Sequence, residues 1–307
     1  WRQTFERAPA VDYVALGEYE ETVADLADAI DKGGDINAIP GLASRAHLQS
    51  GRPLLRPLND NLDRLPMVSP IYQRFLEPEL YTFNLSAHPF VQIMAGRGCP
   101  ASCFFCSYPQ ISQGTPYRHR TAENIVNEMN WIKKNMPQIK QVNFEDDNFG
   151  ADRAFARRLG EVARVSKVDL PFFANISASL DPGSLEALKA AGLHICSVGF
   201  DTIRYSLLEK MGKLQTEKSI HDFMAATRRL GILVHGCFMV GFPGESRGSM
   251  RELYDWACRI RPDSAQFYPV MPYPGTGAWH FYNDKGCLAT TSFRDWLTRA
   301  GWPRCVL

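Results

Sequence analysis

The stretch GRGCPASCFFCSYP, residues 96–109, places three cysteines close together, separated by three and then two residues. Four thiolates close a tetrahedral zinc site or complete an iron–sulfur cluster, whereas three leave one metal position open. Cys99, Cys103 and Cys106 therefore predict a [4Fe–4S] cluster in which the protein holds three irons. The fourth iron would be free to bind a small molecule.

Two other interpretations of these cysteines are a zinc knuckle completed by a distant Cys or His, and three unconnected buried thiols. Structural zinc commonly uses paired knuckles, and the sequence contains no second knuckle. The remaining cysteines are expected to be isolated and buried; they are Cys196, Cys237, Cys258, Cys287 and Cys305.

The composition is that of a large globular α/β domain with an appended segment, since 45% of the 307 residues are hydrophobic and 22% are charged. A net charge of +1 gives no reason to expect a nucleic acid partner. No apolar run reaches the roughly 20 residues of a membrane span. Eight cysteines spread over a long chain predict a reducing, cytoplasmic setting. The chain begins with Trp1 rather than Met, so we expect a fragment of a longer gene product.

Strand and helix patterns alternate regularly from Phe90 onward. The predicted strands are residues 91–94, 141–144, 171–176, 195–198, 234–240 and 265–270. The predicted helices between them are residues 121–136, 152–166, 181–191, 216–230 and about 246–260. Six β/α repeats predict a parallel sheet with helices outside it, either open or curled into a partial (β/α)6 barrel.

The regions outside these repeats are simpler. Residues 11–30 predict one strand and one helix whose apolar face contains Val23, Leu26, Ala27 and Ile30, too little for an independent core. We expect four segments: a first element at 1–32, a linker or extension at 33–89, the barrel at 90–282 and a C-terminal extension at 283–307.

Polar or glycine-rich stretches follow every predicted strand. After the cysteine loop they are EDD (145–147), Asn175 with Ser177, Gly199 with Asp201, GFPGE (241–245) and PYPGT (272–276). In parallel β/α folds the chemistry lies at the carboxyl ends of the strands. These stretches therefore predict a single site on one rim of the sheet.

The C-x3-C-x2-C motif with an aromatic residue before its last cysteine resembles the radical S-adenosylmethionine (radical SAM) enzymes. The resemblance covers about residues 90–282, including the partial barrel. It implies that Cys99, Cys103 and Cys106 hold a [4Fe–4S] cluster whose open iron binds S-adenosylmethionine. One electron from the cluster would cleave the sulfonium to methionine and a 5′-deoxyadenosyl radical, which abstracts hydrogen from a substrate.

The same resemblance implies roles for other residues. Phe105 would lie against the adenine, and Asp147, in the position of the family's Gly-Gly-Glu, would accept from the substrate ammonium. A helix N-cap preceding Asp152 is the alternative interpretation of EDD. Asn175 and Ser177 fall where the family binds ribose and carboxylate, although a simple strand-end turn explains them as well.

Two further positions relate to the family's motifs in different ways: one carries a different side chain, and the other is a glycine that acts through its backbone. Asp201, in GFDT, replaces the glutamate that relatives carry in G-x-E-S. Gly241 opens the family's GxPGE loop, where glycine lets the backbone approach a ligand.

VDYVALGEYEETVADLADAI, EDDNF, GFPGE and PYPGT resemble the cobalamin-binding branch of the superfamily, and PIYQRFL resembles its hopanoid-biosynthesis members. Residues 1–32 would then be the C-terminal remnant of a Rossmann-like cobalamin domain that is truncated at its N-terminus. The D-x-H-x-x-G cobalamin motif is absent, which leaves cobalamin binding open.

The resulting functional hypothesis is a radical SAM enzyme that rearranges or methylates a small-molecule or lipid-linked substrate, with a flavodoxin- or ferredoxin-type electron donor. No general acid, general base or radical relay is identified. The alternatives are a non-catalytic iron–sulfur electron carrier or sensor and a zinc-stabilised binding protein.

Overall fold

The computed structural model describes residues 1–112, 114–213, 215–299, 304, 306 and 307. The chain divides into two compact units, one of which contains Trp1–Asp60, whereas the other contains Asn61–Gln110 and Gly114–Leu307. Among the described residues, no helix has both the length and the apolar character of a membrane span.

The smaller unit is built around an antiparallel pair of short strands. Its elements are α1 (Arg2–Arg7), β1 (Tyr13–Ala15), α2 (Glu20–Lys32), η1 (Ile36–Ala38), β2 (Leu42–Ser44) and α3 (His47–Ser50). The predicted strand and helix are present, but the apolar side chains of α2 remain exposed, with Val23 49% and Ile30 63% accessible. Leu26 is half-buried, so part of the hydrophobic face of α2 stays exposed in this unit.

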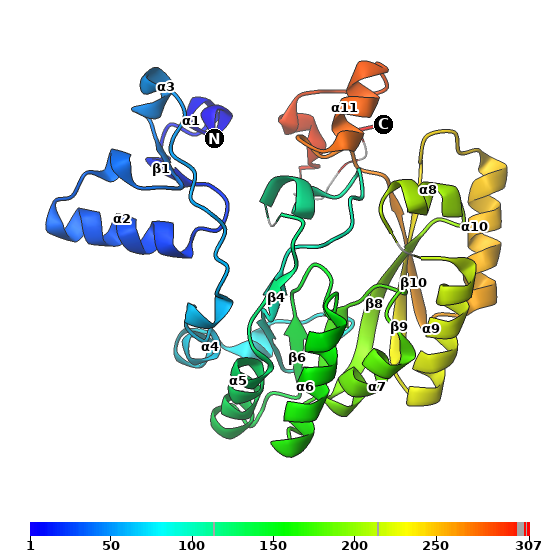
Figure 1. Cartoon of the computed structure of the whole chain (residues 1–307). Helices are drawn as coiled ribbons and strands as arrows, with labels where there is room; N and C mark the ends of the chain where they lie inside the picture. The colour runs from blue at the N-terminus through cyan, green and yellow to red at the C-terminus, as the bar shows by residue number, and fades with distance from the viewer. Residues whose placement is uncertain (113, 214, 300–303, 305) are drawn as a thin grey trace. The chain divides into compact units, whose positions relative to one another are not determined.

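The larger unit is organised around a parallel sheet of six strands (Figure 1). These strands are β3 (Phe90–Ile93), β6 (Gln141–Phe144), β7 (Phe172–Asn175), β8 (Leu193–Asp201), β9 (Leu233–Val240) and β10 (Ser264–Pro269). They pair in chain order, each with the next, so β3 and β10 form the two edges. The predicted partial (β/α)6 barrel is confirmed.

Five of the connecting helices begin within one residue of their predicted starts, whereas the short helix Tyr205–Lys210 was not predicted. The connecting helices are α5 (Ala122–Asn135), α6 (Arg153–Val165), α7 (Pro182–Ala190), α8 (Tyr205–Lys210), α9 (Glu217–Leu230) and α10 (Arg247–Ile260), and α11 (Gly277–Asp284) follows the sheet. Side chains accept backbone N–H groups at the N-termini of α5, α6, α7, α9 and α10; the residues are Thr121, Asp152, Asp181, Thr216 and Ser246. These bonds satisfy amides that a helix start leaves unpaired.

Aromatic side chains fill the space between the sheet and these helices. The rings of Phe144 and Phe149 lie 4.7 Å apart between centroids, and Phe144 meets Phe172 edge-on at 5.1 Å. All three are fully buried. Burying each of these side chains contributes about 1.5–3 kcal/mol to the free energy of folding. This burial stabilises the strands whose ends carry the site.

The segment before the first sheet strand, predicted as linker, contains η2 (Leu62–Arg64), α4 (Ser69–Phe75) and η3 (Pro78–Leu80). Ser69 Oγ donates to the buried Glu128 carboxylate of α5 at 2.7 Å. Ser86 Oγ and the Asn143 side chain of β6 bond to each other at 2.7–2.9 Å. Residues 61–89 are therefore held against the sheet by specific polar contacts.

Strand β10 forms the last edge of the sheet, with β9 as its neighbour among the described strands. All six of its residues are exposed, and Phe267 and Tyr268 are each 37% accessible.

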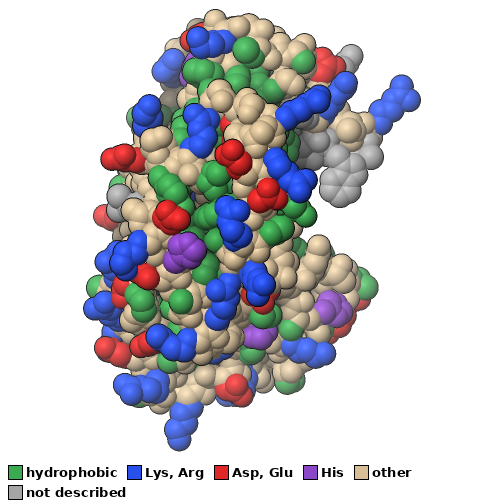
Figure 2. Space-filling model, turned by 90° about the vertical axis from the view of Figure 1, so that its right-hand side faces the viewer, with side chains coloured by type: hydrophobic (Ala, Val, Ile, Leu, Met, Phe, Trp, Pro, Cys, Tyr) green, Lys and Arg blue, Asp and Glu red, His purple; other side chains and the backbone are tan. Residues whose placement is uncertain are grey.

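On the face of the molecule shown in Figure 2, basic and acidic side chains are interspersed, without a region of one sign. That distribution agrees with the small net charge.

Candidate functional site

The cysteine loop leaves the end of β3 through a two-residue strand, β4 (Gly96–Arg97), which pairs with β5 (Arg118–His119). Between them Gly98 adopts φ +90°, and a Cβ at this position would lie 2.2 Å from the Pro116 carbonyl oxygen. Both the backbone angle and the close approach demand glycine. The tight base of the loop is thus set by one residue immediately before Cys99.

Backbone carbonyls within the loop are held by the amide of Gln110. Its Nε2 donates to the carbonyl oxygens of Cys103 and Cys106 at 2.8 and 2.7 Å. Its Oε1 accepts from the Gly277 N–H at 2.9 Å. The side chain therefore ties the cysteine loop to the start of α11 and fixes the backbone that carries two of the thiols.

Two of the three thiols lie in a setting that favours their protonated forms. Burial raises the pKa of Cys103 to about 12, against the lowering effect of the Lys213 ammonium. Burial also raises the pKa of Cys106, and the neighbouring Cys99 raises it further. Since metal ligands must be thiolates, metal binding at this loop would release protons.

The donor set of three thiols on one loop fits a [4Fe–4S] cluster. Zinc requires its sulfur ligands about 2.3 Å from one common point. Three thiols that influence one another electrostatically, with a cationic Lys213 nearby, suit ligation of separate corners of a [4Fe–4S] cluster.

The other cysteines are not uniformly buried. Cys196 is buried and Cys237 is partly buried, whereas Cys258 and Cys287 are exposed. The expectation of burial was wrong for Cys258 and Cys287. Cys258 is exposed because α10 turns other residues, including Trp256 and Ala257, toward the core. Cys287 follows α11 at the surface, and Cys305 lies outside the described residues.

The two aspartates of EDD accept backbone N–H groups from the segment that leads into the cysteine loop. Asp146 accepts from the Ala95 N–H at 2.8 Å and from the Tyr117 hydroxyl at 2.9 Å. Asp147 accepts from the Gly98 N–H at 3.0 Å. The N-cap of α6 is Asp152 itself, so the helix-cap interpretation of EDD is wrong. Asp147 is half-buried beside the loop and raises the pKa of Cys106.

The buried Asp146 predicts a pH dependence of stability. Burial raises its pKa from 3.8 to about 7, so the folded chain keeps a proton that the unfolded chain releases in this interval. This proton contributes its full stabilisation at low pH. As the pH rises toward about 7, the free energy of unfolding falls by up to about 1.4 kcal/mol per pH unit. We expect Asp146→Asn to gain roughly 2 kcal/mol relative to the natural chain between about pH 5 and pH 8.

Urea unfolding of the metal-free protein at both pH values measures this difference. Asp169→Asn, at a carboxylate whose side chain is 89% exposed, is the matched control and should show no such change. An Asp146→Asn variant whose stability follows that of the natural chain at every pH would contradict the assignment.

The polar residues after β7 make contacts within the protein. Asn175 Nδ2 donates to the Asp146 carbonyl oxygen at 3.1 Å. The hydroxyls of Ser177 and Ser179 bond to each other at 2.8 Å. Asn175 thus connects the ends of β6 and β7, and Ser177 lies at the same rim.

Asp201 forms a buried ion pair with Lys213 at the end of β8. Asp201 has φ +56°, a conformation in which Asp and Asn are enriched. Lys213 Nζ also donates to the Gly199 carbonyl oxygen at 3.0 Å. Burial lowers the pKa of Lys213, but Asp201 and then Cys103 raise it more, so the ammonium stays charged beside the thiols.

Phe105 and Gly241 meet through a cluster of rings. The Phe105 ring lies 5.8 Å from that of Phe242, which follows Gly241 in the GFPGE loop. Gly241 donates its N–H to Glu245 Oε2 at 2.7 Å and accepts the Tyr282 hydroxyl at its carbonyl oxygen at 2.8 Å. The glycine-rich loop is therefore braced on both sides, and its neighbouring phenylalanine covers the cysteine loop.

Three residues of this region were not predicted from the sequence: Gln110, Lys213 and Gln215. Lys213 and Gln215 lie after α8, in the connection that leads from β8 to α9. Both residues belong to the connection that follows Gly199 and Asp201, so their position at the rim is the signal in the sequence that marks them.

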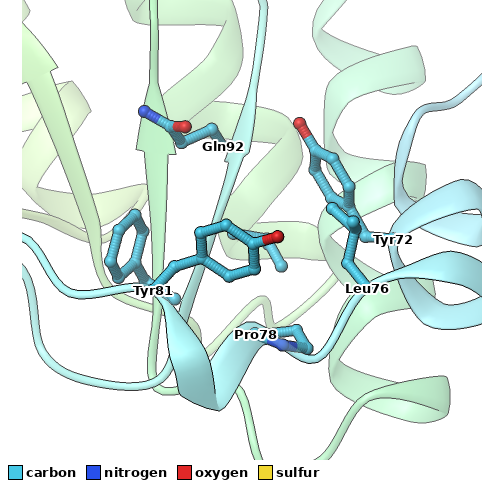
Figure 3. A pocket seen from close by; sticks show the side chains of 7 residues that line it. Tyr72, Leu76, Pro78, Tyr81 and Gln92 are labelled. Carbon is cyan, nitrogen blue, oxygen red and sulfur yellow. The ribbon is translucent and has the colours of Figure 1, made fainter.

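A separate hollow of about 110 Å³ lies at the β3 edge (Figure 3). It is lined by Tyr72, Leu76, Pro78, Tyr81, Phe90, Val91 and Gln92. None of these side chains is charged, so the hollow does not suit a ligand that carries both an ammonium and a carboxylate. It is distinct from the cysteine loop.

Comparison with known proteins identifies the family. The chain is 28% identical to an uncharacterized methyltransferase of Pyrococcus horikoshii over 96% of its own length and 63% of the relative's. It is 25% identical to the hopanoid C-3 methylase of Methylococcus capsulatus over 92% of its own length and 52% of the relative's.

The fold matches the radical S-adenosylmethionine methyltransferase TsrM of Kitasatospora setae, solved with cobalamin and a [4Fe–4S] cluster bound. The TM-score is 0.71 at 23% identity, covering 92% of this chain and 55% of that one. The chain therefore spans between about half and two thirds of the length of these relatives. Residues 93–257, more than half of the sequence, match the profile of the Radical SAM superfamily. The chain belongs to the Radical SAM superfamily, as its cysteine motif predicts.

Proposed function

We propose that this chain is the catalytic part of a radical SAM enzyme of the cobalamin branch, which methylates or rearranges a small-molecule or lipid-linked substrate. The observation that carries the proposal is the set of three thiols on one rim loop, Cys99, Cys103 and Cys106, with no fourth cysteine in that loop. An electron carrier would use a fourth thiolate to close its cluster.

Each rim residue has a part in this proposal. The three cysteines hold a [4Fe–4S] cluster, which with bound S-adenosylmethionine supplies reductive cleavage of the sulfonium to a 5′-deoxyadenosyl radical. Asp147, fixed by the Gly98 N–H, accepts from the ligand's ammonium. Lys213, held by Asp201, keeps a positive charge beside the thiolates.

The remaining candidates position the ligand and exclude water. Ser177 and Asn175 border the ligand at the end of β7, and the Gly241 backbone approaches it from the fifth loop. The rings of Phe104, Phe105 and Phe242, which contact one another at 5.8–6.3 Å, form an apolar wall, with Phe105 against the adenine. Such a wall keeps solvent away from a reactive intermediate.

For the N-terminal region, the proposal is that residues 1–32 are the end of a Rossmann-like cobalamin domain. The exposed apolar face of α2 supports it, because Val23 and Ile30 would pack against the rest of such a domain. Residues 33–89 would connect it to the barrel at 90–282, and residues 283–307 form a C-terminal extension. Cobalamin binding is left open, since the D-x-H-x-x-G motif is absent.

The proposed partners follow from the chemistry. Reductive cleavage needs a one-electron donor of the flavodoxin or ferredoxin type, and the free thiols of the site suit a reducing, cytoplasmic setting. No nucleic acid partner is proposed, because the net charge is +1.

Anaerobic reconstitution tests the function. We expect about four irons and four sulfides per chain, a paramagnetic signal after reduction that shifts when S-adenosylmethionine is added, and reductant-dependent release of 5′-deoxyadenosine. A reduced cluster whose spectrum ignores S-adenosylmethionine would instead indicate an electron carrier or sensor. One zinc per chain without iron would indicate a structural metal site.

A further inference from the structure

Gln215 lies between the Lys213 ion pair and the start of α9, and its side chain is buried, with 4% of the residue exposed. Its Nε2 donates to the Gly199 carbonyl oxygen at 3.1 Å and lies 3.5 Å from Ser177 Oγ. Its Oε1 is buried and has no hydrogen-bond partner among the described residues.

The identity of this unpaired atom follows from its neighbour. A carbonyl oxygen such as that of Gly199 can only accept, so the amide nitrogen of Gln215 must face it. Flipping the amide would place Gln215 Oε1 against the Gly199 carbonyl oxygen, and both of these atoms are acceptors. The atom left without a partner is therefore an acceptor, and burying an acceptor without a donor is unfavourable. The described part of the chain does not supply that donor.

A second buried glutamine shows that burial alone does not leave an amide oxygen unpaired in this fold. Gln141 of β6 is 1% exposed. Its Oε1 accepts from the Ala87 N–H at 3.1 Å, and its Nε2 donates to Asn143 Oδ1 at 3.0 Å. Both ends of Gln141 are satisfied inside the protein, whereas Gln215 has a bonded nitrogen and a buried oxygen that lacks a donor among the described residues.

We propose that Gln215 Oε1 accepts a hydrogen bond from a ribose hydroxyl of bound S-adenosylmethionine, a contact that rests on the function proposed above. Its position supports this assignment, because Gln215 contacts both Ser177 at the end of β7 and Gly199 at the end of β8. These strand ends belong to the rim that carries the cysteine loop.

The surrounding groups favour a hydroxyl over other donors. Lys213 Nζ shares the Gly199 carbonyl oxygen with Gln215, and its positive charge disfavours a ligand ammonium at this point. An exocyclic amine can only donate. A hydroxyl can donate to Gln215 and at the same time accept from the nearby Ser177 hydroxyl.

Ligand-binding measurements on the reconstituted full chain test the contact without relying on turnover. Dissociation constants are measured anaerobically by calorimetry for S-adenosylmethionine and its 2′-deoxy and 3′-deoxy analogues. We expect one analogue to bind the natural chain about tenfold more weakly. Gln215→Met should bind S-adenosylmethionine about tenfold more weakly and distinguish it from that analogue by less than about twofold.

Gln141→Met is the matched control, and it should keep the full discrimination between the ligand and its analogue. A Gln215→Met variant that retains this discrimination would overturn this inference but not the proposed function. The same holds if the natural chain binds both deoxy analogues as tightly as S-adenosylmethionine, and that measurement needs no variant. A natural chain that binds a cluster but no S-adenosylmethionine would overturn the proposed function as well.

Discussion

Replacing any one of Cys99, Cys103 and Cys106 by alanine is expected to abolish stable cluster binding and with it all reductive cleavage of S-adenosylmethionine. Two thiolates cannot hold three irons, and no other cysteine belongs to the loop. The loop backbone should survive, because Gln110 and Gly98 fix it through contacts that do not involve the thiols. Iron and sulfide content after anaerobic reconstitution, with the spectrum of the reduced protein, measures the effect.

The matched control is Cys258→Ala, which removes an exposed thiol of α10. That variant should bind iron like the natural chain. If Cys99→Ala, Cys103→Ala and Cys106→Ala each kept full iron content and an unchanged spectrum, the cluster would have to be held elsewhere and the proposed function would fail.

A large loss of stability is expected when Asp201 is replaced by asparagine. Asparagine also tolerates the positive φ of this position, so the backbone is preserved. The substitution leaves the Lys213 ammonium without its counter-charge, in a place where 16% of the lysine side chain and 6% of the aspartate side chain are exposed. Removing one partner of a buried pair costs about 3–5 kcal/mol.

Chemical denaturation of the reduced, metal-free protein measures the change in the free energy of unfolding. Asp222→Asn breaks the exposed pair with Lys218 on α9 and should cost no more than about 1 kcal/mol. Combining Asp201→Asn with Lys213→Met removes the stranded charge and should recover part of the loss. Equal losses of stability for Asp201→Asn and Asp222→Asn would show that the buried ion pair contributes no more to the free energy of unfolding than the exposed pair.

Most of the barrel could be predicted from local sequence because strands and helix starts carry strong signals. The six predicted strands correspond to β3, β6, β7, β8, β9 and β10. Thr121 and Asp181, the first residues of two predicted helices, accept backbone amides at the starts of α5 and α7. Gly231, directly after the predicted helix 216–230, ends α9 with a φ of +63°. These features depend on neighbours in the chain, which the sequence displays directly.

The parts that escaped prediction depend on contacts between distant segments. Lys213 is one of 34 basic residues, and nothing local marks it as the partner of Asp201. The unpaired oxygen of Gln215 is visible only once Gly199 and Ser177 are placed around it. The burial of Cys258 was wrongly expected for a related reason, since the turn of α10 that faces the core depends on how the helix packs.

The β10 edge of the sheet, which among the described strands pairs only with β9, has a consequence for how this polypeptide behaves in concentrated solution. Strand β10 offers a row of backbone donors and acceptors beside exposed aromatic rings, and such a row can template the addition of a strand from another molecule. The proline at its end, Pro269, lacks an N–H and shortens the template. Self-association through this edge would therefore grow with protein concentration and would be countered by a charged residue at the position of Phe267.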